Sequence, residues 1–417
     1  MLSKFSAISV YTHPKIIAVA FLGFVSGLPL ALTASTLGIW LTEEGISKTA
    51  IGIFALLGTP YVIKFLWAPL IDQLSLPFFT KRLGRRRGWI IFSQMMLIIF
   101  LILLGASNPA INPWNTALFA LFVAIASATQ DIVIDAYRVD VLEDEQQGAG
   151  AAVIVFGYRI GMLVSSAGAL VLASYFGWFT AYCVMAAFIL IGTVTTLLSP
   201  EPYNIKITSA ENFAHWFARA VIEPFGNFMS RESWWLVLIF IILYKLGDAF
   251  AGVMTGPFLI DIGFSKIEIA AIVKTYGVVA ILAGAFIGGS LVARYGLIKS
   301  LWICGILQMV SNLMFVLQAH IGYDSSVLVL TISIENLAGG MGTAAFVAYI
   351  SKLCNAKYTA TQYALFSALA ASGRTWLSSS SGYFVDSFGW VNFFLISTAI
   401  AIPGILLLIL IGKLKEE

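Results

Sequence analysis

The chain alternates long apolar runs with short polar segments. Runs such as 16–41, 90–105 and 391–411 are almost continuously apolar. A bilayer core about 30 Å thick needs about 20 apolar residues for each spanning helix. We therefore expect an all-α polytopic membrane protein. The continuous runs exclude a transmembrane β-barrel, because its strands alternate apolar and polar residues over about ten positions.

Hydropathy, together with glycine and proline positions, predicts twelve spanning helices. They cover 16–41, 49–70, 89–107, 115–137, 148–174, 178–198, 234–256, 267–293, 298–317, 326–350, 360–385 and 390–412. The first run differs from a signal peptide, which has a short apolar core and a small-residue cleavage site, and we interpret it as a retained helix. An even number of spans places both termini on one side.

Positive charge predicts which side that is. With both termini in the cytoplasm, 17 of the 24 lysines and arginines lie in cytoplasmic segments, and only Lys48 and Lys266 lie outside. Such an excess marks the cytoplasmic side. The longest polar segment, 199–233, then forms a cytoplasmic linker between one six-helix bundle at 1–198 and a second at 234–417.

The two halves repeat short motifs in the same order. Gly45-Ile-Ser-Lys48 opens the second span and Gly263-Phe-Ser-Lys266 opens the eighth. Tyr175-Phe-Gly-Trp178 ends the fifth span, and Ser387-Phe-Gly-Trp390 ends the eleventh. A parallel six-plus-six repeat is the signature of major facilitator transporters, which bind substrate between the halves. The pattern predicts a major facilitator fold with two pseudo-symmetric halves.

Three glycine pairs with a spacing of four residues lie in spans one, five and eight. They are Gly23 and Gly27, Gly157 and Gly161, and Gly284 and Gly288. This spacing lets two helices approach closely, so we interpret the pairs as packing surfaces.

Composition narrows the class of protein further. The chain is 59% hydrophobic and 11% charged, whereas soluble domains carry about 25% charged residues. Three cysteines without a spacing motif predict neither a disulfide framework nor a metal site. No metalloprotease, P-loop or dinucleotide-binding motif is present, so we expect no enzyme, no cofactor and no nucleic-acid partner.

Nine charged residues lie at least two positions inside the ends of the predicted spans, where each costs about 2.5–3.5 kcal/mol. They are Lys64, Asp131, Asp135, Arg159, Lys245, Asp248, Lys274, Glu335 and Arg374. Asp131 and Asp135 are four residues apart and share a helix face. Lys245 and Asp248 are three apart and can pair within span seven.

The three histidines, His13, His215 and His320, fall in predicted loops, so carboxylates would have to carry any coupled protons. A carboxylate that is desolvated in one state and ion-paired in another couples protonation to conformation. The candidates for proton coupling are Asp131, Asp248, Glu335 and Asp135. The alternative is that these charges pair only for structure.

Buried cations suit an anionic substrate, and aromatic rings can stack on sugars. The candidates for substrate binding are Arg159, Lys245, Lys274, Arg374, Lys64, Gln130, Tyr61, Tyr158, Tyr276 and Asn336. The aromatic residues have a second interpretation as anchors at the membrane interface.

A basic segment, Lys81-Arg-Leu-Gly-Arg-Arg-Arg87, follows Asp72 at the end of span two. A carboxylate there can pair with a basic side chain in one conformation and release it in another, as a cytoplasmic gate. The candidate gate residues are Asp72, Arg82, Arg85, Arg86, Arg138 and Asp140. The alternative is a positively charged anchor on the cytoplasmic side.

Several longer strings resemble AmpG-type muropeptide permeases, a family of major facilitator transporters. They include Lys64-Phe-Leu-Trp-Ala-Pro-Leu-Ile-Asp72, Gln130-Asp-Ile-Val-Ile-Asp135, Gly157-Tyr-Arg-Ile-Gly-Met162, Tyr244-Lys-Leu-Gly-Asp-Ala-Phe250 and Glu335-Asn-Leu-Ala-Gly-Gly-Met-Gly342. The resemblance runs from about residue 16 to residue 405. Some family members carry two further helices, for which this chain has no room.

The resemblance implies import of GlcNAc–1,6-anhydro-MurNAc, usually with attached peptides, across the inner membrane of a Gram-negative bacterium. Uptake would depend on the proton motive force and serve peptidoglycan recycling and β-lactamase induction. We expect a monomer whose partners are this substrate and the lipid bilayer. Two alternatives remain open: a transporter of another anionic solute such as acetyl-CoA, and a membrane sensor that has kept the fold without transport.

Overall fold

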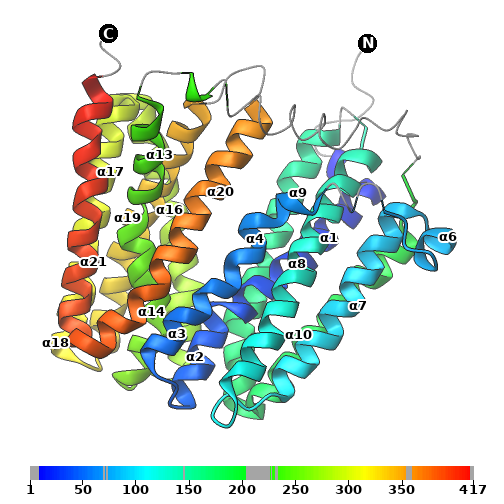
Figure 1. Cartoon of the computed structure of the whole chain (residues 1–417), viewed down its shortest axis with the longest axis horizontal. Coiled ribbons are helices and arrows are strands. Elements are labelled where there is room, and N and C mark those ends of the chain that lie inside the picture. The colour runs from blue at the N-terminus through cyan, green and yellow to red at the C-terminus, as the bar shows by residue number, and fades with distance from the viewer. Residues whose placement is uncertain are drawn as a thin grey trace. The chain divides into compact units, whose positions relative to one another are not determined.

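The computed structural model describes residues 9–68, 71, 74–143, 146–202, 226, 228–230, 233–353 and 359–413, and the regular structure within them is helical throughout. By its contacts the chain divides into two compact units. Unit 1 is residues 1–46 and 57–205, and unit 2 is residues 47–56 and 206–417. Nine helical stretches in the described part are long and apolar enough to cross a membrane (Figure 1).

Unit 1 holds the elements of the first half except α3. They are η1 (Ser9–Thr12), α1 (Pro14–Thr33), α2 (Ser35–Glu43), α4 (Thr59–Ile63), η3 (Lys64–Leu66), α6 (Phe79–Leu83), α7 (Arg85–Ala106), α8 (Pro113–Val141), α9 (Gln147–Leu163), η5 (Val164–Gly168) and α10 (Ala169–Leu198). The segment η5 is a π-helix. Within unit 1, α7 packs against both α8 and α10.

Unit 2 holds the second half together with α3 (Lys48–Phe54), and η2 (Ala55–Gly58) joins α3 back to unit 1. Its other elements are α13 (Trp234–Leu243), α14 (Leu246–Asp261), α15 (Lys266–Glu268), η7 (Ile269–Tyr276), α16 (Gly277–Tyr295), α17 (Leu297–Ser311), α18 (Leu313–Ile321), α19 (Ser325–Leu353), α20 (Thr359–Leu377), η8 (Ser378–Ser380) and α21 (Ser381–Lys413). The segment η7 is a second π-helix.

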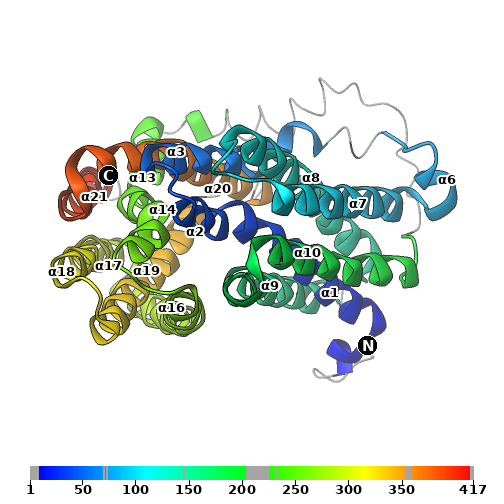
Figure 2. The same cartoon turned by 90° about the horizontal axis from the view of Figure 1, so that it is seen from below.

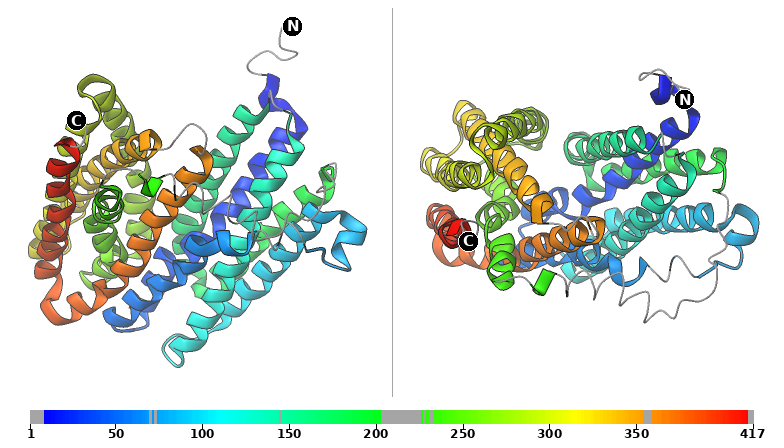
Figure 3. Two further views of the ribbon diagram at one scale, coloured as in Figure 1. Left: turned by 45° about the horizontal axis from the view of Figure 1, so that its top comes forward. Right: turned by 90° about the horizontal axis from the view of Figure 1, so that it is seen from above.

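Two apolar stretches are too long for a single crossing, Val153–Leu198 with 46 residues and Phe366–Gly412 with 47. Each contains one glycine with non-helical angles, Gly177 (φ 80°, ψ 166°) in α10 and Gly389 (φ 73°, ψ 171°) in α21. Glycine adopts these angles without a steric penalty. Figure 3 shows the chain running down α20 and turning upward within α21. The turns lie where the sequence predicts the fifth and eleventh spans to end.

Glycines set the spacing between α1 and α9. Gly23 and Gly27 lie against the backbone of α9, and Gly157 and Gly161 lie against the backbone of α1. A methyl group at any of the four positions would overlap a carbonyl oxygen of the other helix. The two predicted glycine pairs therefore pack against each other. We call this contact the first glycine seam.

A second glycine seam joins α16 to α19, which lie side by side in Figure 2. Gly284 and Gly288 of α16 meet carbonyl oxygens of α19, and Gly340 of α19 meets a carbonyl oxygen of α16. Here only one of the two helices carries a glycine pair with the predicted spacing. Both seams allow van der Waals contact between backbones, which is the main source of helix association within a membrane.

The repeated motifs of the two halves form the same contact. Trp178 Nε1 of α10 donates to Glu43 Oε2 of α2 at 2.8 Å, and Trp390 Nε1 of α21 donates to Asp261 Oδ2 of α14 at 3.2 Å. Each bond ties the turn after the fifth or eleventh span to the end of the first or seventh. In each half, the tryptophan of one repeated motif thus bonds to a carboxylate two residues before the other motif.

Glycines at helix boundaries add two further matches. Gly45 (φ 73°) and Gly263 (φ 100°) begin the two repeated Gly-x-Ser-Lys motifs. Gly84 (φ 89°) and Gly296 (φ 78°) occupy the N-cap positions of α7 and α17. The second pair is absent from the sequence motifs, because its neighbours differ in the two halves.

Candidate functional site

An acidic site in unit 1 lies on α8. Asp131 accepts a hydrogen bond from the Ser26 hydroxyl of α1, and one of its oxygens is 3.6 Å from Lys64 Nζ of η3. Asp135, one turn further along α8, lies within electrostatic range of Lys64 and Arg138. It forms no hydrogen bond or ion pair with other described residues. The Lys64 ammonium therefore attracts both carboxylates, but it forms an ion pair only with Asp131.

Other polar side chains near Asp131 come from α8 itself, from α4 and from α9. Gln130 Nε2 donates to the Val25 carbonyl oxygen of α1 at 3.3 Å, while its Oε1 has no partner among the described residues. Tyr61 and Tyr158 lie within electrostatic range of Asp131. Five sequence candidates for coupling and binding thus accompany Asp131: Asp135, Lys64, Gln130, Tyr61 and Tyr158.

The two arginines among the candidates for substrate binding, Arg159 and Arg374, are exposed. Arg159 lies on α9 next to Tyr158, and Arg374 lies on α20 in unit 2. Neither forms a hydrogen bond or an ion pair with other residues that the structure describes. Each guanidinium is therefore free to meet an anion.

A charged site in unit 2 begins at the break between α13 and α14. Lys245 Nζ lies 3.0 Å from Asp248 Oδ2, which confirms the pair predicted within span seven. Lys245 occupies the N-cap position of α14 and Asp248 its first turn, where the helix dipole favours a negative charge. The pair is local and depends on one helix end.

Glu335 of α19 completes the charged site of unit 2. It lies within electrostatic range of Asp248, Lys245 and Lys274. Neither Glu335 nor Lys274 forms a hydrogen bond or an ion pair with another described residue. Lys274 lies in the π-helix η7, and π-helical turns occur frequently at functional sites. Glu335 is therefore a carboxylate among charges that has no direct partner.

The other two candidates of unit 2 are engaged locally. Asn336 Nδ2 donates to the Ile332 carbonyl oxygen at 3.1 Å, and its side chain lies against Gly277. The Tyr276 hydroxyl and Ser333 Oγ share a hydrogen bond of 2.7 Å. Asn336 lies on α19, and Tyr276 is the last residue of η7.

The basic segment of unit 1 forms an ion pair with α8. Arg86 Nε lies 2.8 Å from Asp140 Oδ2. Arg82 lies over the Phe78 ring at 4.6 Å. Arg85 and Arg138 belong to the same region, whereas Asp72 lies outside the described residues. The pair between the basic segment and α8 therefore involves Asp140.

Glu201 is a member of this region that the sequence interpretation missed. Its two carboxylate oxygens accept from the backbone nitrogens of Arg86 at 2.9 Å and Arg87 at 3.0 Å, at the first turn of α7. Arg87 in turn donates from Nε to the Thr196 carbonyl oxygen at 2.9 Å, near the end of α10. A carboxylate directly after span six, in Ser-Pro-Glu201-Pro, was the available signal, because such a group suits a helix N-terminus.

Residues 47–56 dock onto the second-half elements of unit 2. Lys48 Nζ lies 2.8 Å from Asp261 Oδ1. Asp386 Oδ2 accepts from the Thr49 backbone nitrogen at 2.8 Å and from its hydroxyl at 2.6 Å, at the first turn of α3. Gly52 faces the backbone of η8 and α21. The sequence interpretation assigned no role to these acidic residues.

The turn before α19 carries a separate polar network. Glu268 accepts from the Tyr323 hydroxyl at 2.6 Å and from Ser265 at the start of α15. This hydrogen bond raises the pKa of the Tyr323 phenol above its usual value. The network joins the start of α15 to the turn between α18 and α19.

The histidine positions correct one expectation. His13 is the N-cap of α1, and His320 lies in the last turn of α18 rather than in a loop, since α18 continues to Ile321. His215 lies outside the described residues. Within the described part, no cluster of three or more His, Cys, Asp or Glu could hold a metal ion.

These features define a multi-pass membrane transporter. Residues 19–378 match the sequence family described as Major Facilitator Superfamily, and the chain belongs to that superfamily. The fold agrees with the crystal structure of a bacterial homologue of the human lysosomal transporter Spinster, with a TM-score of 0.73, 13% identity and coverage of 98% of both chains.

Within the superfamily, the chain belongs with the AmpG-type anhydromuropeptide permeases. It is 44% identical over 413 residues to the anhydromuropeptide permease of Escherichia coli K12, covering 98% of this chain and 82% of that protein. It is 37% identical over 403 residues to a putative transporter, AmpG 4, of Rickettsia conorii, covering 96% and 97% of the two chains.

Proposed function

We propose that this protein imports GlcNAc–1,6-anhydro-MurNAc and its peptide-bearing forms, together with protons, across the inner membrane of a Gram-negative bacterium. The observation that carries this proposal is the 44% identity to the Escherichia coli permease over 98% of the chain. The protein would supply the cytoplasm with peptidoglycan fragments for recycling. It would act as a monomer, without a cofactor other than the coupled proton.

The charged sites support this assignment. Arg159, Lys274 and Arg374 have no partner among the described residues and suit the carboxylates of an attached peptide. Tyr61 and Tyr158 beside Asp131 suit the faces of sugar rings. For proton coupling, Asp131 and Glu335 are the leading candidates, because each lies among charges on a different unit.

The proposed topology has twelve spans with both termini in the cytoplasm. The described residues hold nine apolar stretches, two of them divided at Gly177 and Gly389, and the shorter apolar helix Lys48–Ile63 would provide the remaining span. Reporter fusions at residues 203 and 417 should be active only on the cytoplasmic side. Activity of either fusion in the periplasm would reverse the orientation.

The Arg86–Asp140 pair and the polar contacts of residues 47–56 would act as gates in alternating access. The Arg86–Asp140 pair, supported by Glu201, would close the cytoplasmic side of unit 1. The Lys48–Asp261 pair and Asp386 would hold α3 on unit 2 at the periplasmic side. Each gate rests on ion pairs and helix-end contacts, which can break and re-form without unfolding a helix.

Uptake into proteoliposomes tests the function. Labelled anhydromuropeptide and labelled acetyl-CoA are compared with and without an imposed pH gradient, and protein-free liposomes serve as the control. We expect gradient-dependent uptake of the muropeptide only. Uptake that does not depend on the gradient would refute proton coupling. Uptake of acetyl-CoA without uptake of muropeptide would show that the proposed substrate is wrong.

The free cations also favour a second candidate, transport of another anionic solute, because Lys274 and both arginines would suit a phosphate as well as a carboxylate. The acetyl-CoA arm of the experiment separates the two. A protein that binds muropeptide and transports nothing would instead be a sensor.

A further inference from the structure

On α17 and α19 of unit 2, three buried side chains carry polar atoms without a partner among the described residues. Gln308 of α17, Asn312 at the end of α17 and Tyr349 of α19 are 3%, 1% and 3% exposed. Both amide atoms of Gln308, Nδ2 of Asn312 and the Tyr349 hydroxyl have no hydrogen-bond partner in the part of the chain that the structure describes. Buried polar atoms are almost always hydrogen-bonded, so these four atoms need a partner that the described residues do not supply.

The three side chains lie along one interface. Gln308 and Asn312 are four residues apart and share a face of α17. The Gln308 amide oxygen lies against Gly342 of α19, where an added methyl group would collide with it. Gly342 is seven residues from both Glu335 and Tyr349, so the three share one face of α19. The unpaired groups therefore follow the same side of α19 as Glu335.

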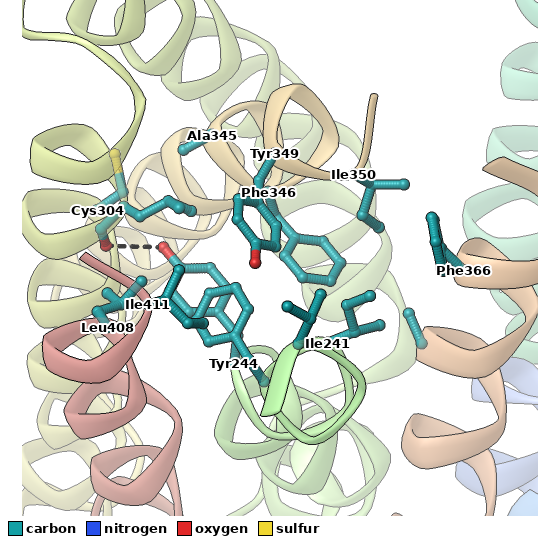
Figure 4. Packing of buried hydrophobic residues seen from close by; sticks show 14 of the residues in the cluster. Ile241, Tyr244, Cys304, Ala345, Phe346, Tyr349, Ile350, Phe366, Leu408 and Ile411 are labelled. Carbon is teal, nitrogen blue, oxygen red and sulfur yellow. Dashed lines mark hydrogen bonds between the residues drawn. The ribbon is translucent and has the colours of Figure 1, made fainter. Parts of the chain in front are cut away.

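The surroundings of Tyr349 show that its hydroxyl is not accommodated by the apolar core. Figure 4 places Tyr349 among Tyr244, Phe346 and Ile241, with its hydroxyl pointing into the cluster. The Tyr244 hydroxyl donates to the Leu301 carbonyl oxygen at 2.9 Å, which the dashed line marks. The Tyr349 hydroxyl has no such bond. A phenylalanine would fill the same space without an unpaired polar atom.

Space is available beside Glu335. Gly339, one turn along α19, is buried, yet a methyl group added there would meet no atom within 4 Å. The charged groups that face Glu335 are Asp248 and Lys245 of α14 and Lys274 of η7. None of these charged groups lies on α17. The polar groups that α17 contributes on the side of α19 that carries Glu335 are the unpaired amides of Gln308 and Asn312.

We propose that Gln308, Asn312 and Tyr349 bind a file of water molecules between α17 and α19, through which Glu335 exchanges its proton with solvent at the Leu353 end of α19. The ligand is water, and a buried water makes about three hydrogen bonds to groups that are otherwise unpaired. When Glu335 releases a proton, the first water accepts it and passes one on. Tyr349 accepts a proton on its oxygen as it donates its own. This inference rests on the proposed proton coupling.

The chain offers a matched control in Gln94 of α7. It is 0% exposed, and its Oε1 accepts from Thr193 Oγ1 of α10 at 3.0 Å. Gln94 therefore differs from Gln308 in its amide oxygen, which has a protein partner, while its Nε2 has none among the described residues. It lies in the unit that lacks Glu335. Both glutamines are replaced by methionine, which has nearly the same length and no hydrogen-bonding amide.

The first measurement needs no transport. Radiolytic hydroxyl-radical labelling, followed by mass spectrometry, reports water held next to a side chain. We expect Tyr349 to be labelled above the level of the equally buried Tyr182, and Gln308→Met to reduce that labelling at least about threefold by removing the groups that order the water. Labelling of Tyr349 no greater than that of Tyr182 in the unmodified protein would overturn the proposal, even if muropeptide transport is established.

The second measurement separates proton movement from substrate movement. Counterflow of labelled muropeptide without a pH gradient should stay within about twofold of the unmodified protein in Gln308→Met, while gradient-driven uptake should fall about tenfold. Gln94→Met should lower the melting temperature in detergent, because Thr193 loses its acceptor, whereas Gln308→Met should not.

Full gradient-driven uptake by Gln308→Met, or a loss of stability equal to that of Gln94→Met, would show that Gln308 is structural. If the unmodified protein transports no muropeptide, the proposed function is refuted. The water file would still be tested by the labelling experiment, which needs no transport.

Discussion

The two units hold their acidic groups in different ways. In unit 1, the Asp131 carboxylate is bound from α1 by Ser26 and from η3 by Lys64. In unit 2, the Lys245–Asp248 pair lies within three residues of one helix end, and Glu335 stands apart on α19. Movement of α8 relative to its neighbours must break contacts of Asp131. Movement of α14 carries its ion pair along as one piece and changes only its distance from Glu335.

Two acidic groups in similar surroundings can therefore respond differently when helices move. Asp131 connects three elements and therefore reports their arrangement. Glu335 connects to no other side chain in the described part, and it can respond to whichever charge approaches it. The repeat in the sequence gives no hint of this difference, because Asp131 and Glu335 both fall in the fourth predicted span of their half.

The largest effect should come from the glycine seams, which hold each unit together. Gly161→Ala in the first seam and Gly288→Ala in the second should each destabilise the protein by about 2–3 kcal/mol, because the added methyl group overlaps a carbonyl oxygen of the facing helix. Thermal unfolding in detergent measures this. Gly289→Ala is the control, since its methyl group meets nothing within 4 Å. Equal melting temperatures for Gly288→Ala and Gly289→Ala would contradict the second seam.

The next effect concerns Asp131. Asp131→Asn should lower gradient-driven uptake by roughly ten- to a hundredfold while the protein still inserts, because Lys64 loses its charged partner and the site loses a titratable group. Uptake with and without the gradient, normalised to inserted protein, measures this. Coupling at the level of the unmodified protein would reduce Asp131 to a structural residue.

Double-mutant cycles test the comparison directly. The coupling energy between Ser26 and Asp131 should be about 1.5 kcal/mol, as expected for a hydrogen bond to a charged group. That between Lys245 and Asp248 should be about 0.5 kcal/mol, since the pair is local and partly exposed. Cycles with Ser26→Ala, Asp131→Asn, Lys245→Met and Asp248→Asn, followed by unfolding, give both values. A larger coupling in unit 2 would reverse the comparison.

The smallest effect should come from the matched tryptophans. Trp178→Phe and Trp390→Phe should each cost about 0.5–1.5 kcal/mol, because each removes one indole hydrogen bond to a carboxylate. Chemical denaturation of the reconstituted protein measures the two costs. Costs that differ by more than about twofold would show that the repeat is matched in sequence but not in strength.

Much of the fold could be predicted from the sequence. Apolar runs and punctuation located the turns at Gly177 and Gly389, and the glycine spacing predicted the first seam. The breaks inside spans were not predicted. The chain leaves the helix at Ala34 and again at Tyr244 and Lys245, where no proline or glycine occupies the position, so local propensity gives no signal.

The residues of the candidate site could be predicted from the sequence, but the contacts between them could not. The cost of a charge within a membrane drew attention to Asp131, Glu335 and Lys274, and the helical period predicted the Lys245–Asp248 pair. Helical period cannot predict contacts between distant segments. It therefore missed Ser26 on Asp131, Glu201 at the start of α7 and Asp386 at the start of α3.

The turns at Gly177 and Gly389 have a consequence for the surface of the protein. Each joins two long helices through a single residue with non-helical angles, so almost no extended chain emerges at either position. Proteases cut at exposed loop tips, where the chain can unfold locally to enter the enzyme. The protein therefore offers a protease or an antibody little to grasp at these two points, and an affinity tag inserted there would disrupt both adjoining helices.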